Sequence, residues 1–305
     1  PPARRPSTMN GKLIAQTTAP RSRTPEAGVV LVNVLVILAI AGGLVVLMLA
    51  AQERATDRVR GAADAAAAEQ IALGAEASVV AALRRDLETA PESDHFNEPW
   101  AAIRQEAVDL PTGRFSVEIE DLQARYDVNQ LAAGTPGARA FIARLLARLD
   151  LPPEHGDTII RVVRAVGPVD GLDGLGDFGV PEAVIDGLRP HATALRPPAP
   201  VNLNTAGPIL LEVMLRNPGL AQRLVRVRAR EGAITRADLA AIGALRPENS
   251  GFTSHAYSVA ITAEAGGARL RLVSRVQRRD GPQGRGVTVL SRRFLTDAPA
   301  PGGAD

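Results

Sequence analysis

Twenty-three consecutive residues without a charge, positions 29–51, constrain this chain more than any other feature. As a helix that rises about 1.5 Å per residue, the run is about 34 Å long, enough to cross a hydrocarbon core of about 30 Å. Before the run stand five basic residues and one acid, Glu26. A basic flank keeps its end of a membrane segment in the cytoplasm. We therefore expect a single transmembrane span with the rest of the chain on the opposite side.

The boundary at Gly28 indicates which kind of span this is. A secretory signal has a shorter apolar region followed by a small-x-small cleavage site, and no such site ends this run. Instead, a basic leader, residues 1–28, ends at Gly28 and the apolar residues begin with Val29. This resembles the leader of type IV pilins and type II secretion pseudopilins. The resemblance implies cleavage after Gly28 by a prepilin peptidase and N-methylation of Val29. An uncut signal anchor is the alternative. Most such proteins carry glutamate at the fifth position after the cut, where this chain has Asn33.

Residues 29–90 are predicted to form one long helix. After the span, an alanine-rich segment has apolar residues at helical spacing up to about Thr89, and Pro91 ends the helix. Two helices with a bend at Gly42-Gly43 or Gly61 are the alternative.

In residues 91–130 the spacing of the apolar residues changes from helical to alternating. Alternation over 114–120 predicts a half-buried strand, and 121–131 is predicted to form a second strand and a turn. Asn129 can close that turn through its own backbone, and Tyr126 offers an amphipathic anchor. Asp-Leu, then Arg-Tyr, then Val-Asn-Gln-Leu at 121–131 is similar to the same region of the minor pseudopilin K family of type II secretion.

An α-helical segment is predicted over 131–250. Helices are expected over 141–149, 158–166 and 181–188, followed by a stiff linker at 197–200. Thr205 is predicted to cap a helix over 207–216, a helix follows over 220–231, and Thr235 is predicted to cap another over 236–242.

Strands return in residues 251–297, before a flexible tail at 298–305. Alternation predicts strands over 255–262, 268–276 and 287–295, with a hairpin at Gly266-Gly267 and a longer loop beginning at Asp280. The fold class is therefore α+β: a pilin-like N-terminal helix and small antiparallel sheet, interrupted by a helical insert of helix-hairpin-helix type. The resemblance to pseudopilin K implies the same architecture.

No catalytic arrangement stands out, so we expect no enzymatic activity. The glycine-rich segment 170–177 contains three aspartates but lacks the spacing of a calcium-binding EF-hand loop. The resemblance implies calcium binding, but pseudopilin K proteins usually carry a longer acidic loop here. We therefore expect neither a metal nor another cofactor.

The segment 201–245 is similar to helix-hairpin-helix units that bind DNA phosphates. Arg223, Arg226 and Arg230 would share one helix face, but the hairpin lacks the Gly-hydrophobic-Gly that exposes amides to phosphate, and Pro218 removes one donor. Although the whole chain has a net charge of +2, the part after Gly28 is acidic. Nucleic acid is therefore an unfavoured partner, and a membrane-anchored DNA-uptake protein is the second hypothesis.

The first hypothesis is a minor pseudopilin at the tip of the type II secretion pseudopilus. The resemblance implies a single-pass protein of a Gram-negative inner membrane with its C-terminal domain in the periplasm. It also implies a role in starting pseudopilus assembly and in exporting folded proteins across the outer membrane. The implied partners are other minor pseudopilins, the major pseudopilin, prepilin peptidase, the inner-membrane secretion platform and membrane lipid.

Overall fold

The computed structural model describes residues 26–89, 92–103, 105–281 and 284–295. They fall into two compact units, with the boundary between Val59 and Arg60, inside the first helix. Helix α1 runs without a break from Glu26 to Thr89. The predicted single helix is therefore confirmed, and the alternative of two separate helices is wrong. The helix also includes Ala27 and Gly28, so it begins earlier than predicted, since nothing in Glu26-Ala27 opposes a helix.

In the first unit, every described residue from 29 to 49 is solvent-exposed although nearly all are apolar. In length and composition α1 can cross a membrane, and it is the one such helix in the described part of the chain. The apolar stretch is therefore available to lipid, as the predicted span requires.

In the second unit, the last part of α1 packs on the sheet. Its buried positions recur at helical spacing and change from small to large along the helix. They are Ala68, Ala72, Ala75, Val79, Leu83 and Leu87. The alanines allow close approach of the sheet, and the later residues fill the core beside Trp100.

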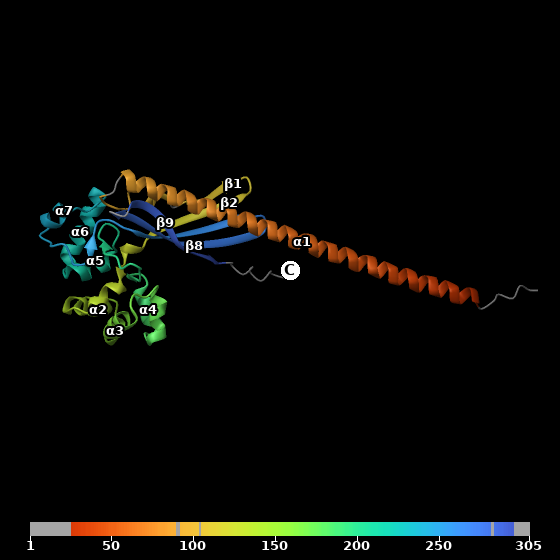
Figure 1. The fold of residues 1–305 in the computed structure, drawn as a ribbon, viewed down its shortest axis with the longest axis horizontal. Helices are drawn as coiled ribbons and strands as arrows, with labels where there is room; N and C mark the ends of the chain where they lie inside the picture. Colours follow the sequence, from red (N-terminus) through yellow and green to blue (C-terminus); the bar gives the residue numbers. More distant parts are fainter. Residues whose placement is uncertain (1–25, 90–91, 104, 282–283, 296–305) are drawn as a thin grey trace, which may run out of the picture. The chain divides into compact units, whose positions relative to one another are not determined.

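The sheet has five antiparallel strands in the order β1-β2-β7-β8-β9 (Figure 1). The strands are β1 (Gln105–Leu110), β2 (Gly113–Asp121), β7 (Ala256–Ala265), β8 (Ala268–Gly281) and β9 (Gly284–Leu295). Burial alternates residue by residue along β7, which is the period expected when one face covers a core. Since β2 pairs with β7 from Arg114 to Asp121, the segment between them is an insert in the sheet.

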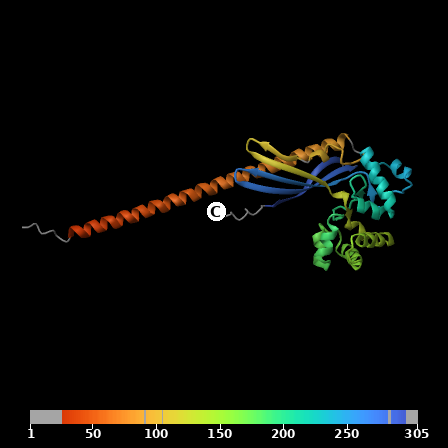
Figure 2. The same cartoon turned by 180° about the vertical axis from the view of Figure 1, so that it is seen from behind.

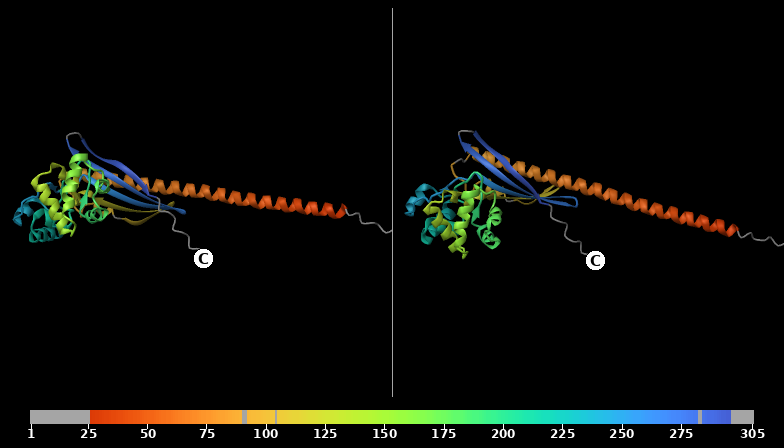
Figure 3. Two further views of the ribbon diagram at one scale, coloured as in Figure 1. Left: turned by 90° about the horizontal axis from the view of Figure 1, so that it is seen from below. Right: turned by 60° about the horizontal axis from the view of Figure 1, so that its bottom comes forward.

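The insert contains six α-helices within the described residues, at one end of the sheet (Figures 2 and 3). They are α2 (Pro136–Arg148), α3 (Glu154–Val166), α4 (Glu182–Leu188), α5 (Pro208–Leu215), α6 (Pro218–Glu231) and α7 (Arg236–Ala241). The 3-10 helices η2 (Leu122–Ala124), η3 (Val128–Ala133) and η4 (Leu172–Phe178) and the two-residue strands β3 (Tyr126–Asp127), β4 (Ala192–Thr193), β5 (Val201–Asn202) and β6 (Ser250–Gly251) connect them. A further 3-10 turn, η1 (Ala101–Ile103), precedes β1. One hydrophobic core runs through the insert.

Several local predictions are wrong. Residues 121–131 form two 3-10 turns and a two-residue strand, because their side chains are buried on several sides and do not alternate between two faces. Strand β1 was not expected, because a bulge between Gln105 and Val108 breaks its period. The longer loop at Asp280 is absent from the described residues, because β8 and β9 continue pairing as far as Gly281 and Gly284. There the Arg285 side chain pairs across the strands with the Asp280 carboxylate.

Two predicted caps have different outcomes. Thr235 caps α7 with a capping box to Asp238, as predicted. Thr205 does not cap α5, which starts from Gly207 without a side-chain cap. The helix starts at Pro208, so Thr205 lies two residues before the cap position, and its hydroxyl donates to the Asp121 carboxylate.

Candidate functional site

Where the insert meets the sheet, buried polar side chains from distant parts of the chain lie together, and we call this set the junction cluster. Its members are Asp86, Asp94, Glu98, Asp121, Asn202, Thr205, Ser254, Tyr257 and Arg278. They come from α1, the segment after α1, β2, β5 and the turn after it, the segment before β7, β7 and β8. Since unpaired polar groups are costly in a core, their pairing decides how firmly the insert is held.

Asp121, the last residue of β2, is the central hydrogen-bond acceptor in the part of the junction cluster that faces the insert. Its carboxylate accepts from the Thr205 hydroxyl at 2.5 Å and from the Ser254 hydroxyl at 2.6 Å. It also accepts from the backbone N–H of Gln123 at 2.8 Å. Burial raises the pKa of Asp121 to about 6. One carboxylate thus bonds the chain at both points where it passes between sheet and insert: at Gln123, just after β2, and at Ser254, just before β7.

Arg278 supplies the positive charge on the sheet side. Its two terminal nitrogens lie 2.8 Å from an Asp86 oxygen and 2.5 Å from an Asp94 oxygen. Asp94 also accepts from the Tyr257 hydroxyl at 3.0 Å and from the Ser254 N–H at 2.7 Å. Asp86 lies on α1 and Asp94 follows it, so this ion pair attaches the end of α1 to strand β8.

Glu98 is a further buried carboxylate, and it lies beside Asp86 and Asp94. Its Oε2 accepts from the Trp100 indole N–H at 2.6 Å, and Trp100 packs edge-on against Tyr257 with ring centroids 5.2 Å apart. Burial raises the pKa of Glu98 to about 7. Single oxygens of Asp86, Asp94 and Glu98 lie within 4.8 Å of one another. The Arg278 guanidinium already bonds the two aspartates, so the group is an ion-pair network centred on arginine.

Asp127 and Asn129 hold the first half of the insert in the same way. Asp127 accepts from the N–H groups of Asn129, Leu195 and Ala199 at 3.0, 3.2 and 2.9 Å. The Asn129 amide bonds the backbone of Val169 in both directions and the carbonyl of Leu195. The prediction that Asn129 closes its own turn is therefore wrong: Asp127 closes the turn, and Asn129 bridges distant segments.

Tyr126 is the buried aromatic anchor that the sequence predicts. It is 3% exposed and stacks on Phe141 of α2, with ring centroids 3.9 Å apart.

Two residues that the sequence analysis did not single out, Asn204 and Arg228, hold the second half of the insert. Asn204 accepts from the Ile234 N–H at 2.6 Å, and Arg228 donates to the carbonyls of Leu203, Asn204 and Ala206.

The helix-hairpin-helix resemblance can be tested at the start of α6. Asn217 caps this helix by accepting from the Leu220 N–H at 3.1 Å, and Pro218 has no N–H to offer. Arg223, Arg226 and Arg230 are exposed on α6, and Arg230 pairs with Glu231. The amides that would hold a phosphate are therefore partly capped or missing.

The glycine-rich segment 170–177 forms most of η4, and two of its carboxylates face arginines. Asp170 pairs with Arg196 at 2.8 Å and Asp173 with Arg189 at 2.7 Å. These pairs neutralise the charge that would attract a cation.

The processing residues of the sequence prediction lie on α1. Gly28, Val29 and Asn33 are all helical, and Val29 and Asn33 are exposed. They belong to the first unit and are not part of the junction cluster.

Comparison with known proteins agrees with this architecture. No model of a protein family matches the chain. The type II secretion system protein K of Pseudomonas aeruginosa is 27% identical over 313 aligned positions, covering 88% of this chain and 93% of that protein. A chain in the crystal structure of the GspK-GspI-GspJ complex from the enterotoxigenic Escherichia coli type 2 secretion system has the same fold. The TM-score is 0.60 at 19% identity, with 79% of this chain and all of that chain covered. The chain is thus a homologue of type II secretion system protein K.

Proposed function

We propose that this chain is a minor pseudopilin that acts at the tip of the type II secretion pseudopilus. There it helps to initiate assembly and the export of folded proteins across the outer membrane. The observation that carries the proposal is a pilin-like helix and antiparallel sheet with a helical insert between β2 and β7, in a homologue of protein K. The chain acts through assembly and has no catalytic role.

In this proposal, residues 29–51 hold the subunit in the inner membrane and the second unit lies in the periplasm. The exposed apolar surface of α1 and the basic residues before it support this orientation. Prepilin peptidase cuts after Gly28 and leaves Val29 as the new, methylated N-terminus. The membrane lipid, the secretion platform and the major pseudopilin are the partners of this helix.

Asn33 and the insert support the proposed tip position. An unpaired carboxylate in lipid is costly, so a glutamate at the fifth position needs a partner such as the free amine of a neighbouring subunit. Asn33 carries no charge and needs no such neighbour. The insert adds bulk at one end of the sheet, which suits a cap (Figure 1). Because the solved complex contains GspI and GspJ beside GspK, other minor pseudopilins are the proposed tip partners.

The junction cluster supports this role because it holds the insert in a fixed orientation on the sheet. A tip subunit must transmit contact forces between its insert and its helix, and buried charge-assisted hydrogen bonds hold such elements in one orientation. We propose neither a cofactor nor nucleic acid as a ligand. The ion pairs at 170–177 and the capped start of α6 support this choice.

The test is co-expression with a prepilin peptidase, followed by intact-mass and N-terminal analysis of the purified chain. We expect a methylated N-terminus at Val29. Gly28→Val is the control, because a branched side chain at the cleavage position should block the peptidase. In the native host, deletion of the gene should stop secretion of folded proteins, and wild type but not Gly28→Val should restore it. A wild-type chain that keeps its leader and still supports secretion would contradict the proposal.

A further inference from the structure

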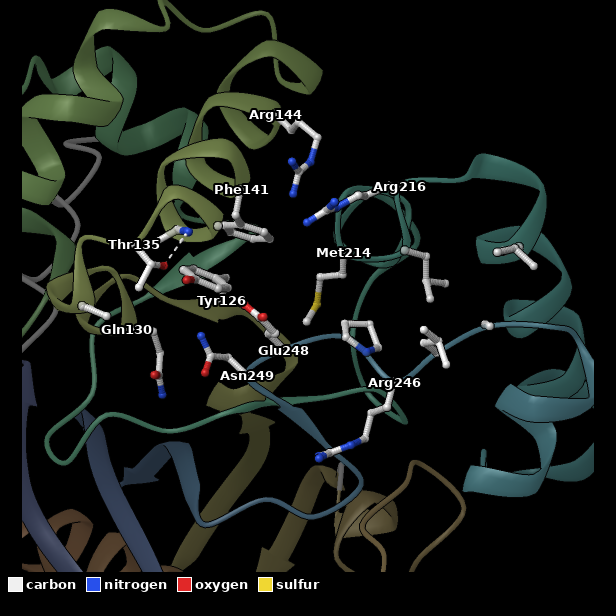
Figure 4. Close-up of a pocket in the computed structure, with 18 of the residues that line it drawn as sticks. Tyr126, Gln130, Thr135, Phe141, Arg144, Met214, Arg216, Arg246, Glu248 and Asn249 are labelled. Carbon is white, nitrogen blue, oxygen red and sulfur yellow. Dashed lines mark hydrogen bonds between the residues drawn. The ribbon is translucent and has the colours of Figure 1, made fainter.

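A pocket of about 420 Å³ opens within the insert, away from the junction cluster (Figure 4). It lies between α2 on one side and the end of α5, the start of α6 and the segment after α7 on the other. The volume falls in the lower part of the range of small-ligand sites, about 300–1,000 Å³. Such a pocket accepts the end of a polypeptide more readily than a long segment.

The floor of the pocket is apolar. Phe141 and Met214 are each 8% exposed, and Tyr126 stacks on Phe141 beside them. Leu245 at the rim is 90% exposed, which is unusual for a large apolar side chain. The surface is thus suited to an apolar side chain that enters from outside.

Two arginines stand at one end of this floor. Figure 4 shows the Arg144 side chain reaching from α2 and the Arg216 side chain from the end of α5, with their guanidinium groups turned toward each other. Neither forms an ion pair with a carboxylate among the described residues, and Nε of Arg144 is buried without a hydrogen-bond partner. Facing cations repel each other, so an anion placed between them would be stabilised by both.

The backbone at Arg216 supports the same conclusion. Arg216 ends α5 with φ of 55°, in the left-handed region where glycine or asparagine is usual. A strained non-glycine residue persists where its side chain is useful, and here the side chain points toward Arg144.

Glu248 makes the distribution of charge in the pocket asymmetric. It lines the opposite side, near Tyr126 and Gly137, and pairs with neither arginine in the described part of the chain. A negatively charged ligand group is therefore drawn to Arg144 and Arg216 and repelled from Glu248, while the third arginine of the lining, Arg246, donates to the carbonyl of Ser250.

We propose that this pocket binds the C-terminal residue of a partner polypeptide, with its carboxylate between Arg144 and Arg216 and its apolar side chain against Phe141 and Met214. A guanidinium matches a carboxylate with two parallel hydrogen bonds. Arg144 and Phe141 lie three residues apart on one helix face, so cation and floor are adjacent. A C-terminal residue carries its carboxylate and its side chain on one Cα atom. Neighbouring residues inside an extended peptide point their side chains to opposite faces.

The test uses the full chain in detergent and a fluorescent, otherwise uncharged hexapeptide that ends in leucine. Fluorescence anisotropy compares the free acid with the C-terminal amide. We expect the free acid to bind at least about tenfold more tightly, the difference that one charge-assisted hydrogen bond supplies. A third peptide, amidated and with an internal aspartate, should bind as weakly as the plain amide.

Two variants separate loss of binding from loss of folding. Arg144→Gln and Arg216→Gly should each reduce the affinity for the free acid to that for the amide. Since glycine suits the left-handed position, Arg216→Gly should melt at or above the temperature of the wild type. Arg223→Gln, an exposed arginine of α6 outside the pocket, is the matched control and should bind normally.

Three results would overturn the proposal. They are equal affinity for acid and amide, acid binding that survives in both pocket variants, and an internal aspartate peptide that binds as well as the free acid. Failure of wild type to bind any peptide at millimolar concentration would also overturn it. None of these results bears on leader cleavage or on secretion.

Discussion

Arg278 of β8 and Asp94, in the segment after α1, form an ion pair with an N–O distance of 2.5 Å, and their side chains are 1% and 0% exposed. Since Asp86 pairs with the same guanidinium, one arginine joins helix α1, the segment after it and the sheet. Asp94 also accepts from Ser254, and Ser254 donates to Asp121. The two sides of the junction cluster therefore act as one network.

Arg278→Met should destabilise the second unit strongly. The change leaves Asp86 and Asp94 as buried carboxylates without a cation, and breaking a buried pair in this way costs about 3–5 kcal/mol. Urea unfolding of the chain in detergent, followed by tryptophan fluorescence, measures the loss, since the Trp100 indole bonds Glu98 of the junction cluster. Arg271→Met, at an exposed position of the same strand, should change the unfolding free energy by less than about 0.5 kcal/mol. Equal effects for the two variants would contradict the ion-pair account.

The contributions of Glu98 and Asp121 to stability should fall as the pH rises from about 5 to 8. Burial raises the pKa of Glu98 to about 7 and that of Asp121 to about 6. Between the unfolded pKa near 4.5 and the folded pKa near 7, the folded state holds more protons than the unfolded state. The contribution of Glu98 to the unfolding free energy therefore decreases with pH across this window.

Glu98→Gln tests this pH dependence at one residue. Glutamine keeps an oxygen that can accept from Trp100 but cannot ionise. The variant should gain about 1–3 kcal/mol over wild type at pH 8 and little at pH 5. Unfolding curves at the two pH values measure the difference, and Glu92→Gln, at an exposed position of the same segment, is the control. A gain that is the same at both pH values would show that Glu98 ionisation is not the cause.

The hairpin between β7 and β8 should depend on Gly266 and much less on Gly267. Gly266 has φ of 52°, and a Cβ atom there would lie 2.3 Å from the Asp64 carboxyl group. That carboxylate also accepts from the Gly267 N–H at 3.0 Å. Gly266→Ala should cost about 1–2 kcal/mol from the left-handed backbone alone, and more from the displaced Asp64. Gly267→Ala meets Asp64 only at 3.9 Å and should cost less than about 1 kcal/mol in the same unfolding assay. A reversed order would mean that Asp64 does not restrain the turn.

Regular patterns in the sequence predicted most of the fold. The charge-free run, the alternation in β2, β7 and β8, and the Thr235 cap each depend on neighbours a few residues away. The chemistry of residues 121–131 could not be found in this way. Asn129 bonds Val169 and Leu195, which lie 40 and 66 residues further along the chain. Such partners are set by tertiary packing, and a turn is the natural local expectation for asparagine.

One signal for the junction cluster was present in the sequence. Leu272, Ser274, Val276 and Arg278 share one face of β8, and that face is buried. A charge at an inward position of an alternating strand predicts a buried partner. The identity of that partner could not be predicted, because Asp86 and Asp94 are distant in sequence and look like ordinary residues of a helix end and a loop.

Asn33→Glu should reduce secretion and move the subunit from the tip. In the proposed function, asparagine suits a position where no neighbouring amine pairs with the fifth residue. A glutamate there is either left unpaired in lipid, at a cost of about 3 kcal/mol, or draws the subunit into the shaft, where a neighbour can neutralise it. Both outcomes lower the number of correctly capped pseudopili, so secretion of a folded substrate should fall several-fold in the complemented deletion strain.

Asn33→Gln has the size of glutamate without its charge and should behave as wild type. Crosslinking to the other minor pseudopilins locates the subunit. Unchanged secretion together with unchanged tip crosslinks in Asn33→Glu would show that the missing charge does not determine the position of this chain.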